Sequence, residues 1–174
     1  MARSPFNAES GGILRWPGGV ARCALGRSGV TLAAAKREGD GASPVGLWPM
    51  REVYFRPDRL ERPVTALAVE PLTPEAGWCD DPASPLYNRP VRLPSPLSHE
   101  KLWREDHIYD LIVVLGYNDD PVVPGKGSAI FLHLARDDYS STEGCVACAR
   151  QDLLSLLAAA RPGDTLEIIG RDIP

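Results

Sequence analysis

The chain has 174 residues and a formal net charge of −4. That length suits one domain with a sizeable core. Its 19 Lys and Arg residues are scattered, so the sequence shows no electrostatic footprint for a phosphate backbone, and nucleic acid is not an expected partner. The longest apolar run, "LIVVL" at 111–115, is far shorter than the roughly 18 residues of a membrane span, so no span is expected.

The N-terminal stretch "MARSPFNAESGG" lacks the apolar centre of a secretory signal, so a cytoplasmic location stays open. We expect residues 1–10 to form a flexible N-terminus and residues 171–174 a tail. A single domain is then expected over residues 11–170.

The first half of the chain is typical of short strands separated by Gly and Pro. "GILRW" (12–16) and "VARCALG" (20–26) predict a hairpin, and "VTLAAA" (30–35) a further strand. Seventeen Pro and 16 Gly leave little room for long helices. The sequence therefore predicts a mainly β domain with long Pro-rich loops.

Residues 71–106 are rich in Pro and show neither strand nor helix periodicity. A segment of that length without structure of its own is usually functional or disordered. Because it contains Trp78, Tyr87 and Trp103, with Tyr109 nearby, we expect an ordered lid or groove wall. For each of these residues, the simpler interpretation is that its aromatic ring only packs the loop against the core.

The second half begins with two strands and ends with a helix and a strand. "YDLIVVLGY" (109–117) and "SAIFLHLA" (128–135) predict strands that are buried on both faces. Residues 149–161, "ARQDLLSLLAAAR", carry one apolar stripe and predict the main helix. "RPGD" ends it, and "TLEIIG" (165–170) predicts a closing strand.

A histidine at a strand end and a cysteine twelve positions later suggest a nucleophile with its base. If the loop folds back, the imidazole of His133 can draw the thiol of Cys145 toward the reactive thiolate. Gly144 would let a substrate carbonyl approach the backbone amides of residues 143–145. On spacing alone, a hydrogen-bonded core histidine is the more common case.

Two separated motifs resemble one family. "FLH" (131–133) followed by "SSTEGCVA" (140–147) resembles the signature of the L,D-transpeptidase catalytic domain (YkuD-type) family. "KREGDGASPVGLWPM" (36–50) is similar to that family's Lys-x-Gly-Asp-Gly stretch. The chain departs from it where Glu143 replaces the usual histidine and Ala147 the usual Arg or Asn.

The resemblance implies a β-sandwich with one main helix after the cysteine. It implies Cys145 as nucleophile, His133 as general base, and the backbone amides of Glu143, Gly144 and Cys145 as oxyanion hole. Tyr109, Thr142 and Trp78 are candidates for contacting the substrate.

The implied function is cysteine-dependent acyl transfer on peptidoglycan stem peptides, with release of D-alanine and without cofactor or metal. An L,D-carboxypeptidase or a crosslink-cleaving amidase would use the same site, and a noncatalytic envelope-binding module is the alternative outside enzymes. The resemblance also implies a periplasmic or cell-envelope location.

Cys145 and Cys148 form a C-x-x-C pair, but the strand and helix alternation around a thioredoxin-like motif is missing. A zinc site from these cysteines and His133, with His99 or His107, lacks the usual paired spacing. We expect Cys148 to pack as a small apolar residue.

Overall fold

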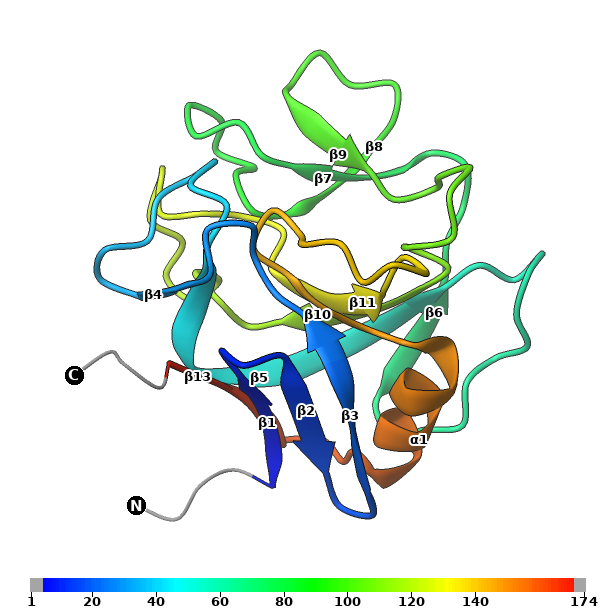
Figure 1. Cartoon of the computed structure of the whole chain (residues 1–174). Coiled ribbons are helices and arrows are strands. Elements are labelled where there is room, and N and C mark those ends of the chain that lie inside the picture. The colour runs from blue at the N-terminus through cyan, green and yellow to red at the C-terminus, as the bar shows by residue number, and fades with distance from the viewer. Residues whose placement is uncertain (1–4, 171–174) are drawn as a thin grey trace.

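The strand β5 (Ser43–Phe55) takes part in both layers of a β-sandwich. Its first half pairs with β13 (Thr165–Ile169), and its second half pairs with β10 (Leu111–Leu115). The computed structural model describes residues 5–170. Because β5 bends from one layer into the other, the main sheet closes on itself around a single core (Figure 1).

The first layer contains the hairpin that the sequence predicted, β2 (Ile13–Trp16) and β3 (Gly19–Ala24), together with β1 (Phe6–Glu9) and β13. The expectation of a flexible segment over residues 1–10 was wrong from Phe6 onward, because β1 pairs in parallel with β13. Residues 1–4 and the predicted tail, 171–174, lie outside the described residues.

The second layer contains β10, β11 (Phe131–Leu134) and β12 (Val146–Cys148), with β6 (Ala68–Pro71) beside β5. Every side chain of β10 and β11 is buried, as the apolar runs predicted. The predicted strand at 30–35 corresponds to β4 (Val30–Leu32), which pairs with the start of β5.

The helix α1 (Arg150–Ala159) closes one end of the core, which confirms the predicted helix at slightly narrower bounds. Leu153, Leu156 and Leu157 are wholly buried on its inner face. The helix stops before Pro162, whose ring disfavours helical backbone at the residue that precedes it. With ten residues, α1 is too short to cross a bilayer, and residues 5–170 contain no helix that could do so.

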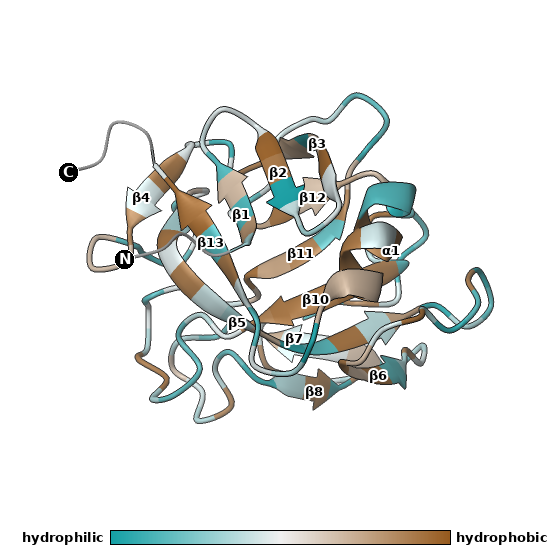
Figure 2. Ribbon diagram, turned by 90° about the horizontal axis from the view of Figure 1, so that it is seen from below, coloured by the Kyte–Doolittle hydropathy of each residue, from teal (hydrophilic) through white to brown (hydrophobic). Residues whose placement is uncertain are grey.

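The segment predicted as a long loop or lid has structure of its own. It forms a three-stranded antiparallel sheet of β7 (Ala76–Cys79), β8 (Pro90–Arg92) and β9 (His99–Lys101). In Figures 1 and 2 these strands cover the side of β10 and β11 that faces away from β1, β2 and β3. We call residues 71–106 the lid.

Two apolar clusters therefore lie on the two faces of the second layer. One is the core between the layers, to which Leu111, Val113 and Leu132 belong. The other lies under the lid, where Trp78 and Leu102 pack on Ile112, Val114 and Phe131. The continuous apolar run of β10 follows from this double burial.

Candidate active site

His133 of β11 and Cys145, which directly precedes β12, lie on the face of the second layer that the lid covers. His133 is level with Ala147 in the register of β11 and β12, and Leu132 is level with Val146. Successive side chains of a strand alternate between faces, so Cys145 shares the face of Phe131 and His133. The apolar clusters agree, because Cys145 packs with Phe131 under the lid and Val146 with Leu132 in the core. The structure thus brings the predicted nucleophile and base to one side of the sheet.

The thiol of Cys145 is buried and held by backbone groups. Its Sγ accepts a hydrogen bond from the amide of Phe131 at 3.3 Å and donates to the carbonyl of Ala129 at 3.2 Å. Burial, and then the nearby Glu100 carboxylate, raises the pKa of the Cys145 thiol to about 12. The thiol is therefore protonated at neutral pH in the resting state.

The imidazole of His133 is fixed in one tautomer. Its Nδ1 lies 2.9 Å from the carbonyl oxygen of Leu134, which can only accept, so Nδ1 carries the proton. Nε2 is then left with the free electron pair of a general base. Complete burial lowers the pKa of His133 to about 4, so the ring is neutral at pH 7.

The turn before Cys145 is fastened by the hydroxyl of Thr142. Its Oγ1 donates to the Cys145 carbonyl at 2.7 Å and accepts from the Gly144 amide at 3.1 Å. Of the three backbone amides predicted for the oxyanion hole, the amide of Gly144 already donates its hydrogen bond to Thr142. Gly144 has a φ of +138°, and a Cβ there would lie 2.9 Å from the Ala42 carbonyl oxygen, so only glycine fits this position.

The stretch at 36–50 borders the site. The Ser43 hydroxyl accepts from the Gly26 amide at 3.0 Å and lies 3.4 Å from the carbonyl of Cys145. Lys36, at the start of this stretch, is only 2% exposed, and its Nζ lies 2.7 Å from the carboxylate of Asp40. Asp40 lies in the Gly-Asp-Gly turn four residues after Lys36, and its carboxylate can hold the lysine in a buried position. The sequence therefore contained an indication that Lys36 is paired.

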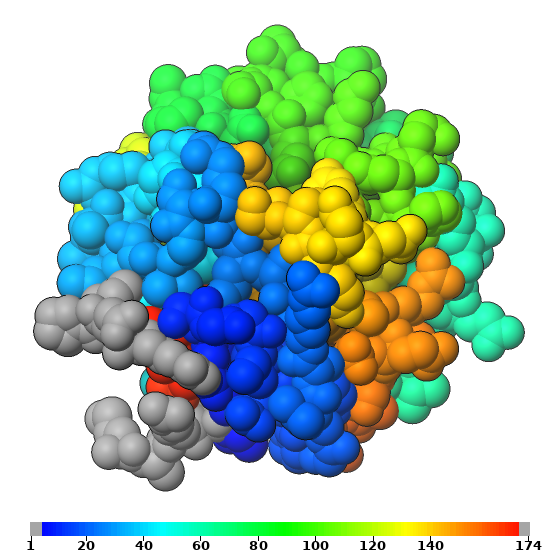
Figure 3. Space-filling view, viewed as in Figure 1, coloured from blue at the N-terminus to red at the C-terminus, as the bar shows by residue number. Residues whose placement is uncertain are grey.

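A cleft of about 610 Å³ opens between the lid and the second layer, and both His133 and Cys145 line it. The volume is in the range of ligand sites. Side chains of both charges surround it: Lys36, Lys101, Arg104, Arg136, Glu38, Asp80, Glu100 and Glu143. In Figure 3 the surface segment between His133 and Cys145, in gold, lies directly beneath the lid, in green.

Tyr109 lines the cleft and joins its floor to the lid. The ring stacks edge to face on His133, with centroids 5.1 Å apart, and its hydroxyl donates to Glu100 of β9 at 2.6 Å. Burial raises the pKa of Glu100 above its usual value, and Tyr109 partly opposes that rise. The sequence analysis missed Glu100, because β9 has three residues and no periodicity to predict which side chain turns inward.

Trp78 lies behind the wall of the cleft instead of facing into it. It is 5% exposed, stacks edge to face on Phe131 and donates from Nε1 to Asn88 at 2.9 Å. Thr142 and Glu143 line the cleft. Glu143, which replaces the histidine of the resembled motif, is largely exposed and pairs with Arg27 at 2.9 Å.

The remaining histidines have other partners. His107 is exposed and contacts the buried carboxylate of Asp110 at 2.8 Å. His99 lines the cleft from β9, with Nδ1 2.6 Å from the Leu97 carbonyl oxygen. Within residues 5–170, no three His, Cys, Asp or Glu side chains are arranged to hold a metal ion.

Cys148 and Cys145 lie on opposite faces of the second layer. Cys148 is wholly buried in the core between the layers. Two residues three apart in extended chain have Cα atoms about 10 Å apart, beyond the reach of a disulfide. This geometry disfavours both the C-x-x-C redox role and the zinc set.

The comparisons with known proteins agree with the motifs. The family model of the L,D-transpeptidase catalytic domain (YkuD) matches residues 7–168, which is nearly the whole described chain. Searches of curated proteins and of solved structures return no significant match. The match covers the mainly β sandwich, the helix α1, and both His133 and Cys145. The chain therefore belongs to the L,D-transpeptidase catalytic domain family.

Proposed function

We propose that the protein catalyses acyl transfer on peptidoglycan stem peptides through a thioester on Cys145. One observation carries this proposal: a thiol and a neutral imidazole with a free Nε2 lie on the same sheet face and line the same cleft. The same two residues lie in the stretches that resemble the family's motifs, and the family model covers both of them. The resemblance implies the stem peptide as substrate.

The first step joins the sulfur to the substrate. Cys145 Sγ attacks the carbonyl carbon before the terminal D-residue, and Nε2 of His133 takes the thiol proton. Because both groups are neutral at rest, the proton moves during the attack instead of before it. The C–N bond then breaks, and the imidazolium returns the proton to the leaving amine of D-alanine.

The tetrahedral oxyanion needs donors that are not already committed. The Gly144 amide is held by Thr142, which leaves the amides of Glu143 and Cys145 as the proposed oxyanion hole. Thr142 would act by fixing the turn, without touching the substrate. Gly144 lets the turn pack closely against Ala42, because any side chain at this position would collide with the Ala42 carbonyl oxygen.

The second step transfers the acyl group to an acceptor. An amine of a neighbouring stem peptide forms the new C–N bond, the C–S bond breaks, and the amine proton passes through Nε2 back to the sulfur. Water in place of the amine would make the protein an L,D-carboxypeptidase or, on a crosslink, an amidase.

The charges of the cleft suit a substrate with carboxylates and an ammonium group. Arg104, Lys101 and Arg136 can receive carboxylates, and Glu100 and Asp80 can receive an ammonium. We place the protein in the periplasm or cell envelope, where such peptides are, and fractionation of the tagged protein tests that placement. Finding it wholly in the cytoplasm would overturn the crosslinking role.

Mass spectrometry of purified tetrapeptide muropeptides tests the proposal. Wild-type protein and Cys148→Ala should both release D-alanine, and Cys145→Ala should lose nearly all activity. Dimers that depend on added acceptor amine would identify the transpeptidase, and release without dimers the carboxypeptidase. If the muropeptides bind equally well to wild type and Cys145→Ala without turnover, the binding module is the correct function.

A further inference from the structure

Two cysteines that the active site does not use face each other across neighbouring strands. Cys23 of β3 and Cys148 of β12 are register partners in an antiparallel pair. Both are free thiols here, and both belong to the core between the layers. Directly opposed residues of an antiparallel pair place their side chains on the same face of the sheet.

The backbone hydrogen bonds fix the kind of pair they form. The Cys23 amide donates to the Gly12 carbonyl on the β2 side, and the Cys148 carbonyl accepts from Ala135 on the β11 side. The backbone groups of each cysteine thus point away from the other cysteine. This is the non-hydrogen-bonded type of pair, in which opposed Cα atoms approach to about 4.5 Å and side chains lie closest. Disulfides need Cα atoms roughly 4.4–6.8 Å apart, a range that the typical spacing of this type of pair meets.

The surroundings of the two sulfurs agree with their proximity. Burial, and then Glu9, raises the pKa of Cys23 to about 12. Burial also raises the pKa of Cys148, and Asp152 and Cys23 itself make smaller contributions in the same direction. Among residues 5–170, the two thiols belong to no group of three His, Cys, Asp or Glu side chains that could hold a metal ion.

Other pairings are disfavoured by the fold. Cys145 lies on the opposite face of β12 from Cys148, as described above. Cys79 lies in the lid sheet, where its register partner is His99. Cys23 and Cys148 are thus the pair of cysteines that the described strands oppose directly.

We propose that Cys23 and Cys148 are a modification site that forms a cross-strand disulfide in an oxidising environment. The two thiols lose two protons and two electrons as the S–S bond forms. An oxidised disulfide, either a small one such as oxidised glutathione or that of a protein thiol oxidant, accepts the electrons and is reduced to two thiols.

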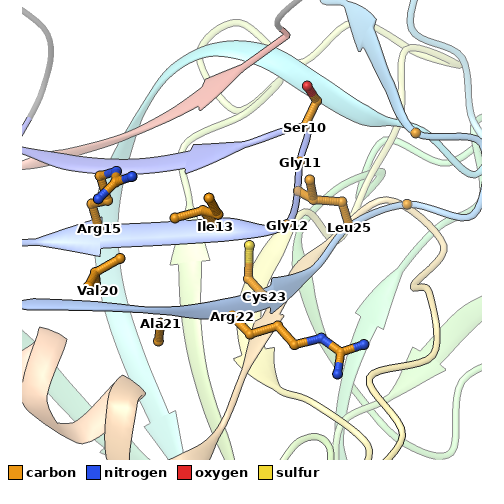
Figure 4. A pocket seen from close by; sticks show the side chains of 12 residues that line it. Ser10, Gly11, Gly12, Ile13, Arg15, Val20, Ala21, Arg22, Cys23 and Leu25 are labelled. Atoms are coloured by element: carbon orange, nitrogen blue, oxygen red, sulfur yellow. The ribbon is translucent and has the colours of Figure 1, made fainter.

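Cys23 is the less deeply buried of the two cysteines. Cys23 is 4% exposed and is among the residues that line an open depression of about 780 Å³ (Figure 4). Cys148 is wholly buried. Exchange in the folded protein is therefore expected to begin at Cys23. Because Cys145 is on the other face of β12, its thiol stays free in the oxidised protein.

The disulfide would join strands that are far apart in the sequence. It closes a loop from residue 23 to residue 148, and long loops restrict the unfolded chain most. For a chain of this size the oxidised form should melt about 10 °C above the reduced form. The bond would hold β12, which directly follows Cys145, against β3.

The test uses full-length wild-type protein after treatment with oxidised glutathione or with dithiothreitol. Alkylation after denaturation should find two free thiols in the oxidised sample and four in the reduced sample. Trypsin places Cys23 in "CALGR" (23–27), and both Cys145 and Cys148 in "DDYSSTEGCVACAR" (137–150). The linked peptides should appear in wild type and in Cys145→Ala and disappear in Cys148→Ala.

Thermal unfolding gives an independent readout. Cys23→Ala and Cys148→Ala should each abolish the difference in Tm between oxidised and reduced samples, and Cys79→Ala should keep it. Four free thiols in oxidised wild type, or a linkage through Cys145 or Cys79, would overturn the proposal. These wild-type results decide the matter even if a core variant fails to fold.

Discussion

The thiol of Cys145 donates its hydrogen bond to the Ala129 carbonyl, and the imidazole of His133 donates its own to Leu134. The two groups share a sheet face and a cleft, but each is tied to backbone and each is uncharged. A thiol has one hydrogen, so it must leave Ala129 before Nε2 can accept it. In this structure the two groups are therefore a neutral thiol and a neutral imidazole, and under the proposed mechanism the proton would move during the attack.

The acid limb of kcat/KM should fall near pH 4. Below that pH His133 is protonated and cannot accept the thiol proton, and burial is what lowers its pKa so far. The pH profile of D-alanine release, measured at substrate well below KM, checks this. A limb near pH 6.5, the ordinary histidine value, would mean that His133 is solvated in the working enzyme or is not the base.

His133 should also make stability depend on pH. Its folded pKa of about 4 lies below the ordinary 6.5, so the unfolded chain binds a proton that the folded chain does not between these values. Stability from this group is complete above pH 6.5 and is lost as pH falls toward 4, by about 3 kcal/mol. Urea unfolding of wild type and His133→Asn across this range measures the difference. Parallel curves for the two proteins would contradict it.

Thr142→Val should lower kcat roughly tenfold or more while leaving the chain folded. Valine keeps the shape but removes the oxygen that accepts from Gly144 and donates to the Cys145 carbonyl, so the turn loses both bonds. Thr142→Ser, which keeps the hydroxyl, should recover most of the rate. If valine and serine behave alike, the hydroxyl does not position the nucleophile.

Tyr109→Phe should raise KM several-fold with a smaller effect on kcat. The change removes the bond between the cleft floor and Glu100 of the lid, which leaves a buried carboxyl without that donor. Steady-state kinetics with the tetrapeptide donor separates the two constants. A kcat as low as that of Cys145→Ala, at unchanged KM, would show that the hydroxyl takes part in the chemistry.

The sequence analysis succeeded where one segment carries its own signal. The run "LIVVL" is apolar at every position because β10 is buried on both faces, and α1 has a stripe of leucines with a proline after it. His133 and Cys145 were singled out because they belong to motifs that resemble those of the family, not because spacing alone required them.

What was missed depends on contacts between distant segments. Nothing local indicates that β5 bends to pair with both β13 and β10, since a strand's partners lie elsewhere in the chain. The lid strands have three or four residues each, too few for a period to emerge. Phe6 was assigned to a flexible end because no local pattern marks its strand. That strand forms only by pairing with residues near 166.

The measurement that tests the central claim most directly is the intact mass of the protein after brief mixing with a tetrapeptide donor and acid quenching. The account predicts an adduct equal to the donor minus D-alanine, located on Cys145, removed by hydroxylamine as expected of a thioester, and missing in Cys145→Ala. Cys148→Ala, with its change on the opposite face, should form the adduct as wild type does. D-Alanine release that persists in Cys145→Ala, or an adduct on another residue, would contradict the account.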